Sequence, residues 1–137
     1  MEAHESEPAR IRKPTSENIT HMKKVLILGA GLVSKPMVEY LLGEGFEVII
    51  ATRTVEKADK LLGGHKNGRA VAWVMEDMET LSGMVRDSDL TVSLLPYRFH
   101  VDVAKFCLRY RKPLVTTSYV SPAMQALHDD AVKAGVI

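Results

Sequence analysis

The feature that most constrains the fold of this chain is an apolar run that meets two glycines and then a helical pattern. The stretch "KKVLILGAGLVSKPM" covers residues 23–37. Its apolar part, residues 24–29, carries no polar residue after Lys24, as expected for a strand that is buried on both faces. A strand, a glycine turn and a helix in this order are typical of a βαβ unit, so the sequence favours a parallel sheet covered by helices.

The same order of elements repeats along the chain. Further strands are predicted at residues 46–52, 70–75, 89–96 (with the loop at the end) and 113–118, and residues 136–137 are expected to begin a sixth. Thr54 and Ser121 are expected to cap two of the intervening helices. Apolar residues at helical spacing predict the inward positions Val33, Met37, Tyr40, Leu41, Val55, Ala58, Leu61, Leu62, Met78, Leu81, Val85, Val101, Ala104, Leu108, Met124, Leu127 and Ala131. The predicted fold class is α/β, a doubly wound, mostly parallel sheet of the Rossmann type that ends at the start of its sixth strand.

Length and composition add few constraints. The chain has 137 residues, which suits one domain, and a net charge of +1, which gives no bulk attraction to nucleic acid or to an anionic membrane. Residues 1–21 are polar and show neither helical nor strand periodicity of apolar residues. We therefore expect a disordered leader or an expression tag before a folded domain at 22–137. The lone Cys107 and the lack of a long apolar segment predict a cytoplasmic protein.

The glycine loop predicts a nucleotide site. It nearly spells the dinucleotide fingerprint G-x-G-x-x-G: Gly29 would make the tight turn and Gly31 would let the main chain approach a pyrophosphate. Ser34 replaces the third glycine, whose role is helix packing, at a modest expected cost. Main-chain N–H groups around Leu32 and Val33 would point at the phosphates. The structural alternative is a tight turn that binds nothing.

The end of the second predicted strand indicates which nucleotide. A site for NAD usually has Asp or Glu there, bonded to the ribose 2′-hydroxyl. This strand instead ends in "IIATRT", with no carboxylate. Arg53 can pair with a 2′-phosphate, and Thr52 and Thr54 can donate hydroxyl hydrogen bonds to it. The prediction is therefore NADP(H), and the alternative is an exposed arginine that opens a solvated helix.

Three stretches together resemble one family. "LGAGLVSKP", "ATRT" and "SLLPYRFHVDVAKFCLRYRKPLVTTSYVSPAM" are similar to the NADP-dependent, glutamate-forming saccharopine dehydrogenases, over residues 23–137. The most specific part is "LPYRFH" followed by "VTTSYVSPAM". The resemblance implies an oxidoreductase of the lysine α-aminoadipate pathway, which reduces the imine formed between 2-aminoadipate 6-semialdehyde and glutamate.

The resemblance also implies roles for individual residues. Pyrophosphate would contact the loop at Ala30, Gly31, Leu32 and Val33, and the adenosine phosphate would contact Thr52, Arg53 and Thr54. Asp77 would lie near the adenine, and Leu94 and Leu95 beside the cofactor. The nicotinamide would lie near Thr117 and Ser118, the substrate would reach Ser118 and Tyr119, and Tyr119 is the best candidate for a catalytic group.

Most of these residues have a plainer alternative. Asp77 can cap the next helix, and the hydroxyls of "TTS" can satisfy their own turn. Tyr97 and Phe99 are expected to pack, and His100 and Cys107 to be structural. An ordinary phenol titrates near pH 10, which makes Tyr119 a poor acid–base group at neutral pH. His65 and His128 are not spaced for a metal site, and none is predicted.

Family members continue past a segment like "KAGVI" into a substrate domain. The resemblance therefore implies that the substrate domain is absent here and that this chain, alone, is catalytically incomplete. The expected partners are a small-molecule amino-acid substrate and, in the full-length enzyme, a second copy, with no nucleic acid and no membrane.

Two rivals remain open. One is a non-enzymatic nucleotide sensor, such as the regulatory domain of a potassium transport system. Sensors of that kind usually carry an acidic residue at the end of the second strand, where this chain has none. The other is a nucleotide-sugar or polyamine-pathway reductase, which would change only the substrate.

Overall fold

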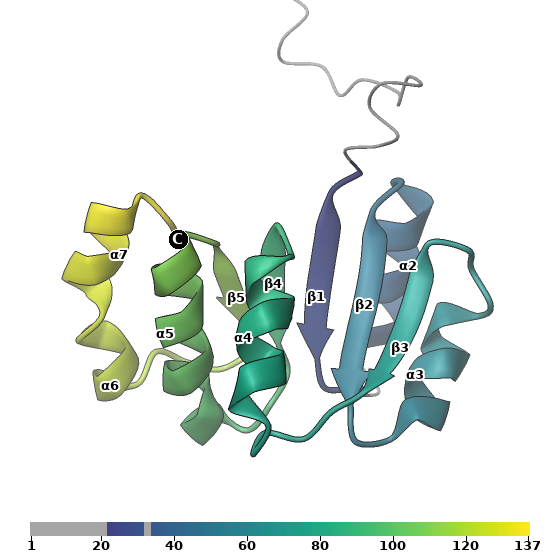
Figure 1. The fold of residues 1–137 in the computed structure, drawn as a ribbon, viewed down its shortest axis with the longest axis horizontal. Helices are drawn as coiled ribbons and strands as arrows, with labels where there is room; N and C mark the ends of the chain where they lie inside the picture. The colour runs from purple at the N-terminus through teal and green to yellow at the C-terminus, as the bar shows by residue number, and fades with distance from the viewer. Residues whose placement is uncertain (1–21, 32–33) are drawn as a thin grey trace, which may run out of the picture.

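The computed structural model describes residues 22–31 and 34–137, so the expected leader, Leu32 and Val33 lie outside the described residues. The elements alternate as the sequence predicts (Figure 1). In chain order they are β1 (Lys24–Leu28), α2 (Lys35–Gly43), β2 (Glu47–Thr52), α3 (Val55–Leu62), β3 (Gly68–Ala72), α4 (Met78–Arg86), β4 (Leu90–Ser93), the 3₁₀ turn η3 (Tyr97–Phe99), α5 (His100–Tyr110), β5 (Leu114–Thr116), α6 (Pro122–Gln125) and α7 (His128–Ala134).

The five strands form one parallel sheet in the order β3-β2-β1-β4-β5. After β1 the chain builds outward through β2 and β3, then returns to add β4 and β5 on the other side of β1. The strand order therefore reverses between β1 and β4, which is the position where open α/β sheets bind ligands beyond the carboxyl ends of their strands. This arrangement confirms the predicted doubly wound fold.

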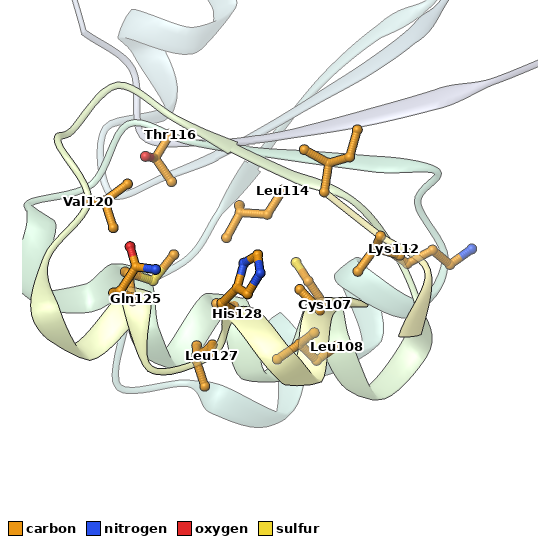
Figure 2. Close-up of a pocket in the computed structure, with 14 residues that line it drawn as sticks. Cys107, Leu108, Lys112, Leu114, Thr116, Val120, Gln125, Leu127 and His128 are labelled. Carbon is orange, nitrogen blue, oxygen red and sulfur yellow. The ribbon is translucent and has the colours of Figure 1, made fainter. Parts of the chain in front are cut away.

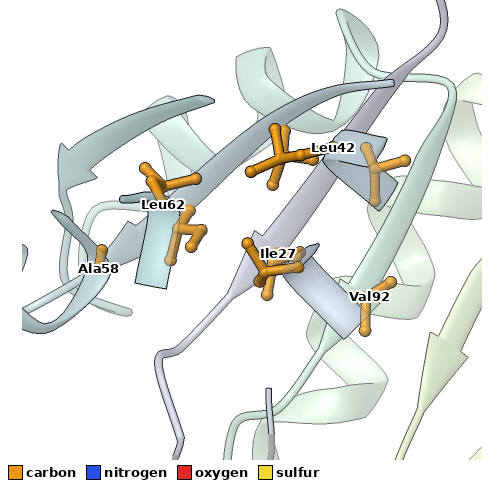
Figure 3. Close-up of a cluster of buried hydrophobic side chains, with 9 residues drawn as sticks. Ile27, Leu42, Ala58, Leu62 and Val92 are labelled. Atoms are coloured by element: carbon orange, nitrogen blue, oxygen red, sulfur yellow. The ribbon is translucent and has the colours of Figure 1, made fainter. Parts of the chain in front are cut away.

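Helices cover both faces of the sheet, which explains why its central strands read as continuous apolar runs. Alternate residues of one strand enter different cores: Ile27 faces α2 and α3, whereas Leu26 and Leu28 face α4 and α5. Figure 3 shows the first core, in which Ile27, Leu42, Ala58, Leu62 and Val92 converge from β1, α2, α3 and β4. Each face of β1 is thus sealed by a separate apolar layer.

Ile27→Ala is expected to lower the free energy of unfolding by about 2–5 kcal/mol, because the side chain is fully buried at the centre of the sheet and truncation leaves a cavity. Urea denaturation measures this loss. Tyr40→Ala is the control, since Tyr40 on α2 is 65% exposed and its removal should change stability by no more than about 0.5 kcal/mol. Equal losses in the two variants would contradict the described core.

Several predicted details are wrong. Tyr40 and Met78 were expected to face inward, yet both are exposed, because the buried stripes of α2 and α4 run through Val38 and Leu42 and through Leu81 and Val85. The single helix that was expected after Ser121 is two short helices, α6 and α7, separated at Ala126 and Leu127.

Element ends also differ from the sequence prediction. The third strand begins at Gly68 and ends at Ala72, and its pairing with β2 starts at Val48 opposite Gly68. The Trp73 side chain then turns toward the start of α4, and its indole N–H donates to the Asp77 carbonyl at 3.0 Å. Thr54 precedes α3, but its side chain makes no capping hydrogen bond, whereas Ser121 does cap α6 by accepting from the Met124 N–H. Residues 136–137 form no strand, although the Ile137 carbonyl accepts a hydrogen bond from the Leu114 N–H at 3.0 Å.

Candidate functional site

The glycine turn after β1 brings two strand ends together at the switch point. Gly29 has φ +97°, a left-handed conformation that favours glycine, and its N–H donates to the Ala51 carbonyl at 2.9 Å. A Cβ on Gly29 would lie 3.5 Å from the Cβ of Leu94, and the Leu94 N–H donates to the Leu28 carbonyl at 2.9 Å. The segment that follows β4 therefore packs directly against the turn that follows β1.

Gly31 is different, because neither its φ nor a close contact with a described residue requires glycine there. It is exposed, its φ lies outside the left-handed region, and a Cβ built on it would meet no described atom within 4 Å. A glycine with open space above it allows a ligand to approach the main chain closely. The open space at Gly31 would let a pyrophosphate approach the main chain, so the described residues fit that group.

Ser34 closes this loop in a way that the sequence did not reveal. It occupies the position of the third glycine and is 1% exposed. Its N–H donates to the Gly31 carbonyl at 3.2 Å, and its hydroxyl donates to the same oxygen. A buried hydroxyl with a partner costs little, so the serine is accommodated and also fixes the Gly31 peptide. Leu32 and Val33, the predicted phosphate-facing residues between them, lie outside the described residues.

The end of β2 places a cation at the same edge of the sheet. Thr52 is buried, and its Oγ1 accepts from the Thr54 N–H at 3.2 Å, while Arg53 and Thr54 are exposed. Among the residues that the structure describes, no salt bridge involves Arg53. An exposed guanidinium that forms no salt bridge with the described residues can take a phosphate as its partner.

Asp77 caps α4, as its plainer interpretation predicted. Its carboxylate accepts from the Thr80 hydroxyl at 2.7 Å and from the Thr80 N–H at 3.1 Å, and these bonds, the hydroxyl first, hold the pKa of Asp77 below its usual range. The side chain is exposed at the carboxyl end of the sheet. Contact with adenine stays a prediction.

The turn after β5 carries the residues predicted for the nicotinamide and the substrate. Thr117 is exposed, Ser118 half-buried and Tyr119 99% exposed. Within this turn, the Thr116 hydroxyl donates a hydrogen bond to the Ser118 carbonyl at 3.4 Å. Thr116 was not singled out from the sequence, although it is the first residue of the same "TTS". The two hydroxyls beyond it make no hydrogen bond with any residue that the structure describes.

The segment between β4 and α5 is partly packed. Phe99 is half-buried, and the Arg98 guanidinium lies 4.5 Å from the centre of its ring. Tyr97 was expected to pack but is exposed. Leu94 and Leu95, predicted to lie beside the cofactor, are half-buried where β4 ends. The site therefore offers apolar side chains after β4, which pack toward opposite faces of the sheet, and polar groups after β5.

His100 is buried, which is compatible with its expected structural role. It is 2% exposed at the first residue of α5, and burial lowers the pKa of its imidazole, against a smaller opposing effect of the Leu95 main chain. Among the described residues its Nε2 has no hydrogen-bond partner. Burial therefore favours the neutral form of His100.

This burial predicts a pH dependence of stability. The unfolded chain binds a proton at His100 below about pH 6.5, and the folded chain binds it only at lower pH, so stability should fall as pH drops below about 6.5. The limiting slope is about 1.4 kcal/mol per pH unit for one proton. Urea midpoints between pH 5 and 7.5 measure it, and His100→Gln should flatten the curve. An identical slope in the variant would contradict the prediction.

The remaining candidates for chemistry are Cys107, which is buried in α5, and possible metal ligands. Burial raises the pKa of the Cys107 thiol to about 11, with a smaller opposing effect of Thr91, so the thiol form is favoured at neutral pH. Within residues 22–31 and 34–137, no three His, Cys, Asp or Glu side chains gather as a metal site would require. None of the helices in the same residues is long and apolar enough to span a bilayer.

Comparison with known proteins gives one consistent result. The family profile described as the saccharopine dehydrogenase NADP binding domain matches residues 25–137. The chain is 42% identical over 114 residues to a saccharopine dehydrogenase [NADP(+), L-glutamate-forming] of Pyricularia oryzae. This alignment covers 83% of this chain and 25% of that protein. It is 36% identical to a mitochondrial alpha-aminoadipic semialdehyde synthase of Bos taurus, over 83% of this chain and 12% of that one.

A solved structure agrees. The apo saccharopine dehydrogenase (L-Glu forming) of Saccharomyces cerevisiae superimposes with a TM-score of 0.75 at 36% identity, covering 83% of this chain and 26% of that one. This chain thus spans about a quarter of the Pyricularia oryzae and Saccharomyces cerevisiae proteins.

Proposed function

Because the chain belongs to the saccharopine dehydrogenase NADP-binding domain family, we propose that it holds NADP(H) for an oxidoreductase that joins 2-aminoadipate 6-semialdehyde and glutamate by imine reduction. The observation that carries the proposal is the pairing of two features at one sheet edge. Gly31 leaves open space for a diphosphate, and Arg53 presents a guanidinium where an NAD site would present a carboxylate.

Each part of the cofactor has proposed partners in this chain. The amides of the loop from Ala30 to Val33, with the amino end of α2, bind the diphosphate, and Gly29 shapes the turn. Arg53 pairs with the 2′-phosphate, and Thr52 and Thr54 add hydroxyl bonds. Asp77 lies toward the adenine, and the cofactor passes beside Leu94 and Leu95, which follow β4.

The nicotinamide end is proposed to lie beside the turn after β5. NADPH supplies the hydride for the reduction. Thr117 and Ser118 orient the nicotinamide, and Ser118 and Tyr119 contact the substrate. The phenol of Tyr119 is fully accessible, so we assign it to positioning the substrate at the open edge of the sheet.

The rest of the reaction requires residues outside this chain. We propose that residues 22–137 form the cofactor domain, and that a separate substrate domain, like the additional length of the relatives, holds the charged groups of the amino-acid substrate. A homodimer of the full-length enzyme and a cytoplasmic location with a reduced Cys107 belong to the same proposal, which assigns no role to nucleic acid or to a membrane.

Calorimetric titration of the chain with NADPH and with NADH tests the proposal. We expect NADPH to bind at least about tenfold more tightly, a difference of about 1.4 kcal/mol that one charge-assisted hydrogen bond can supply. Equal affinity for the two nucleotides would favour the nucleotide-sensor alternative, and no binding of either would favour an empty scaffold. Both results would contradict the proposal.

A further inference from the structure

A groove with a cationic rim lies between α5 and α7. Its volume is about 520 Å³, and its floor includes the apolar side chains of Leu108 and Leu127. In Figure 2, the Leu127 side chain points away from Leu114 of β5, toward the outer side of these helices. The groove can therefore take an apolar side chain on its floor and acidic groups at its rim. The charged residues of the rim are Lys105, Arg109, Arg111, Lys133 and one carboxylate, Asp130.

The cations of the rim are not balanced by acidic neighbours. All four are exposed, and among the described residues none of them forms a salt bridge. Four positive charges against one negative charge leave an excess of +3 around this groove, whereas the whole chain carries +1. Lys105 and Arg109 lie four residues apart on α5, so their charges repel each other on one helix face. An anionic partner would relieve this repulsion.

Arg111 adds a second observation at the end of α5. It has φ 56°, a left-handed conformation that glycine adopts without strain. Helices α3 and α7 end in the same conformation at Gly63 and Gly135. A cation near the carboxyl end of a helix is favourable, but Arg109 in the last turn of α5 already supplies one. A side chain held at such a position points to a function, and we attribute it to the groove.

The same chain carries a surface of the opposite charge. Residues 74–80, "VMEDMET", lie between β3 and the first turn of α4 and contain three carboxylates and no cation. In this acidic segment Val74 is 40% exposed and Met78 is 37% exposed. All three carboxylates are exposed and, within the part of the chain that the structure describes, outside any salt bridge. They belong to Glu76, Asp77 and Glu79. The acidic segment is thus complementary to a cationic rim around an apolar floor.

The two surfaces lie toward opposite ends of one helical layer. Helices α4 and α5 pack on the same face of the sheet, and the acidic segment follows β3 at the carboxyl edge of the strands (Figure 1). Helix α5 begins at that edge with His100 and ends at the other edge with Tyr110, close to Arg111. Two copies that face each other across this layer, related by a twofold axis, would each place the acidic segment over the partner's groove. Both contacts would then form in one closed dimer.

We propose that a second copy of this chain docks its acidic segment into the groove between α5 and α7. The carboxylates of Glu76 and Glu79 pair with the cations of the rim, and Met78 covers the apolar floor. Nucleic acid fits this groove less well, because it offers phosphates but no apolar side chain for the floor. No step of this inference uses the cofactor, so it goes beyond the proposed function and is tested separately from it.

Sedimentation velocity of the whole chain tests the contact with two charge-reversed variants. The groove variant is Lys105→Glu with Arg109→Glu, and the segment variant is Glu76→Lys with Glu79→Lys. Asp77 is left unchanged because its carboxylate caps α4. Each variant alone brings like charges together at both contacts of the dimer. A mixture of the two has opposite charges at both contacts, since one contact is then native and the other is reversed.

A matched control changes the same charges on another surface. Lys57→Glu with Lys60→Glu replaces two exposed cations of α3, which covers the opposite face of the sheet. The control has the same net charge as the groove variant. A difference between these two proteins therefore reports the groove and not a general repulsion between like-charged copies.

We expect the wild-type chain to form dimers with a dissociation constant on the order of 100 μM in about 20 mM salt, and at least about tenfold weaker dimers in about 0.5 M salt. The groove variant and the segment variant should each associate at least about tenfold more weakly than the wild type. Their equimolar mixture should regain the wild-type dissociation constant. The α3 control should keep it to within about threefold.

A wild-type chain that stays monomeric up to about 1 mM in low salt would overturn the inference, since the groove would then belong to another occupant. Equal association of the wild type and both variants would also overturn it, because a different surface would hold the copies together. So would a mixture that associates no better than its two components. The salt dependence of the wild type tests the ionic contact even where a variant does not fold.

Discussion

Replacing Gly31 with valine is expected to weaken NADPH binding by at least about 100-fold, because the branched side chain fills the space that the diphosphate needs and several charge-assisted bonds, each about 1.5–3 kcal/mol, are lost. The free energy of unfolding should change by no more than about 0.5 kcal/mol, since a Cβ there meets no described atom. Calorimetric titration and urea denaturation of the same sample measure the two effects.

Gly29→Ala is the matched control for this variant. Gly29 has φ +97°, so alanine there is strained, and its Cβ would lie 3.5 Å from Leu94. We expect Gly29→Ala to lower the free energy of unfolding by about 1 kcal/mol or more. A Gly31→Val protein that binds NADPH normally would show that the diphosphate lies elsewhere. One that unfolds would show that Gly31 serves the fold.

Replacing Arg53 with alanine is expected to weaken NADPH binding about 10- to 100-fold and to leave NADH binding unchanged. The variant loses charge-assisted hydrogen bonds to the 2′-phosphate, each worth about 1.5–3 kcal/mol, and NADH lacks that group. Arg53 is exposed and, among the described residues, makes no salt bridge, so stability should not change. Competition titrations with both nucleotides measure the change in preference.

Two further variants separate charge from geometry at this position. Arg53→Lys keeps the charge but loses the planar, two-pronged donor, so it should recover part of the affinity. Arg69→Ala removes an exposed arginine from the β3 edge without approaching the loop, and it should bind both nucleotides as wild type does. An equal loss of affinity for NADPH and NADH in Arg53→Ala would mean that the residue supports the fold of the site and does not bind the 2′-phosphate.

The strands of the sheet could be predicted from the sequence because strands buried on both faces consist of continuous apolar residues. Leu26 and Ile27 face opposite cores and are both fully buried, so the run that contains them has no polar residue on either face. The glycine loop and Arg53 could be placed for a similar reason. The carboxyl ends of neighbouring parallel strands meet at one edge, so residues that follow β1 and β2 are brought together by topology alone.

The remaining details depend on tertiary contacts that no local pattern encodes. Tyr40 lies at helical spacing with Met37 and Leu41, but the buried stripe of α2 runs through Val38 and Leu42 and leaves Tyr40 in solvent. The break between α6 and α7 falls at Ala126 and Leu127, where no glycine or proline signals it. Asp77 shows a different limit, since a carboxylate at the start of a helix suits a cap and an adenine contact equally well.

Determining the structure of the NADPH complex tests the central claim most directly. The account predicts the diphosphate within hydrogen-bond distance of the main-chain amides that follow Gly31, and the 2′-phosphate within the same distance of the Arg53 guanidinium. A complex in which Arg53 points into solvent while the nucleotide lies away from the first turn of α2 would contradict the account.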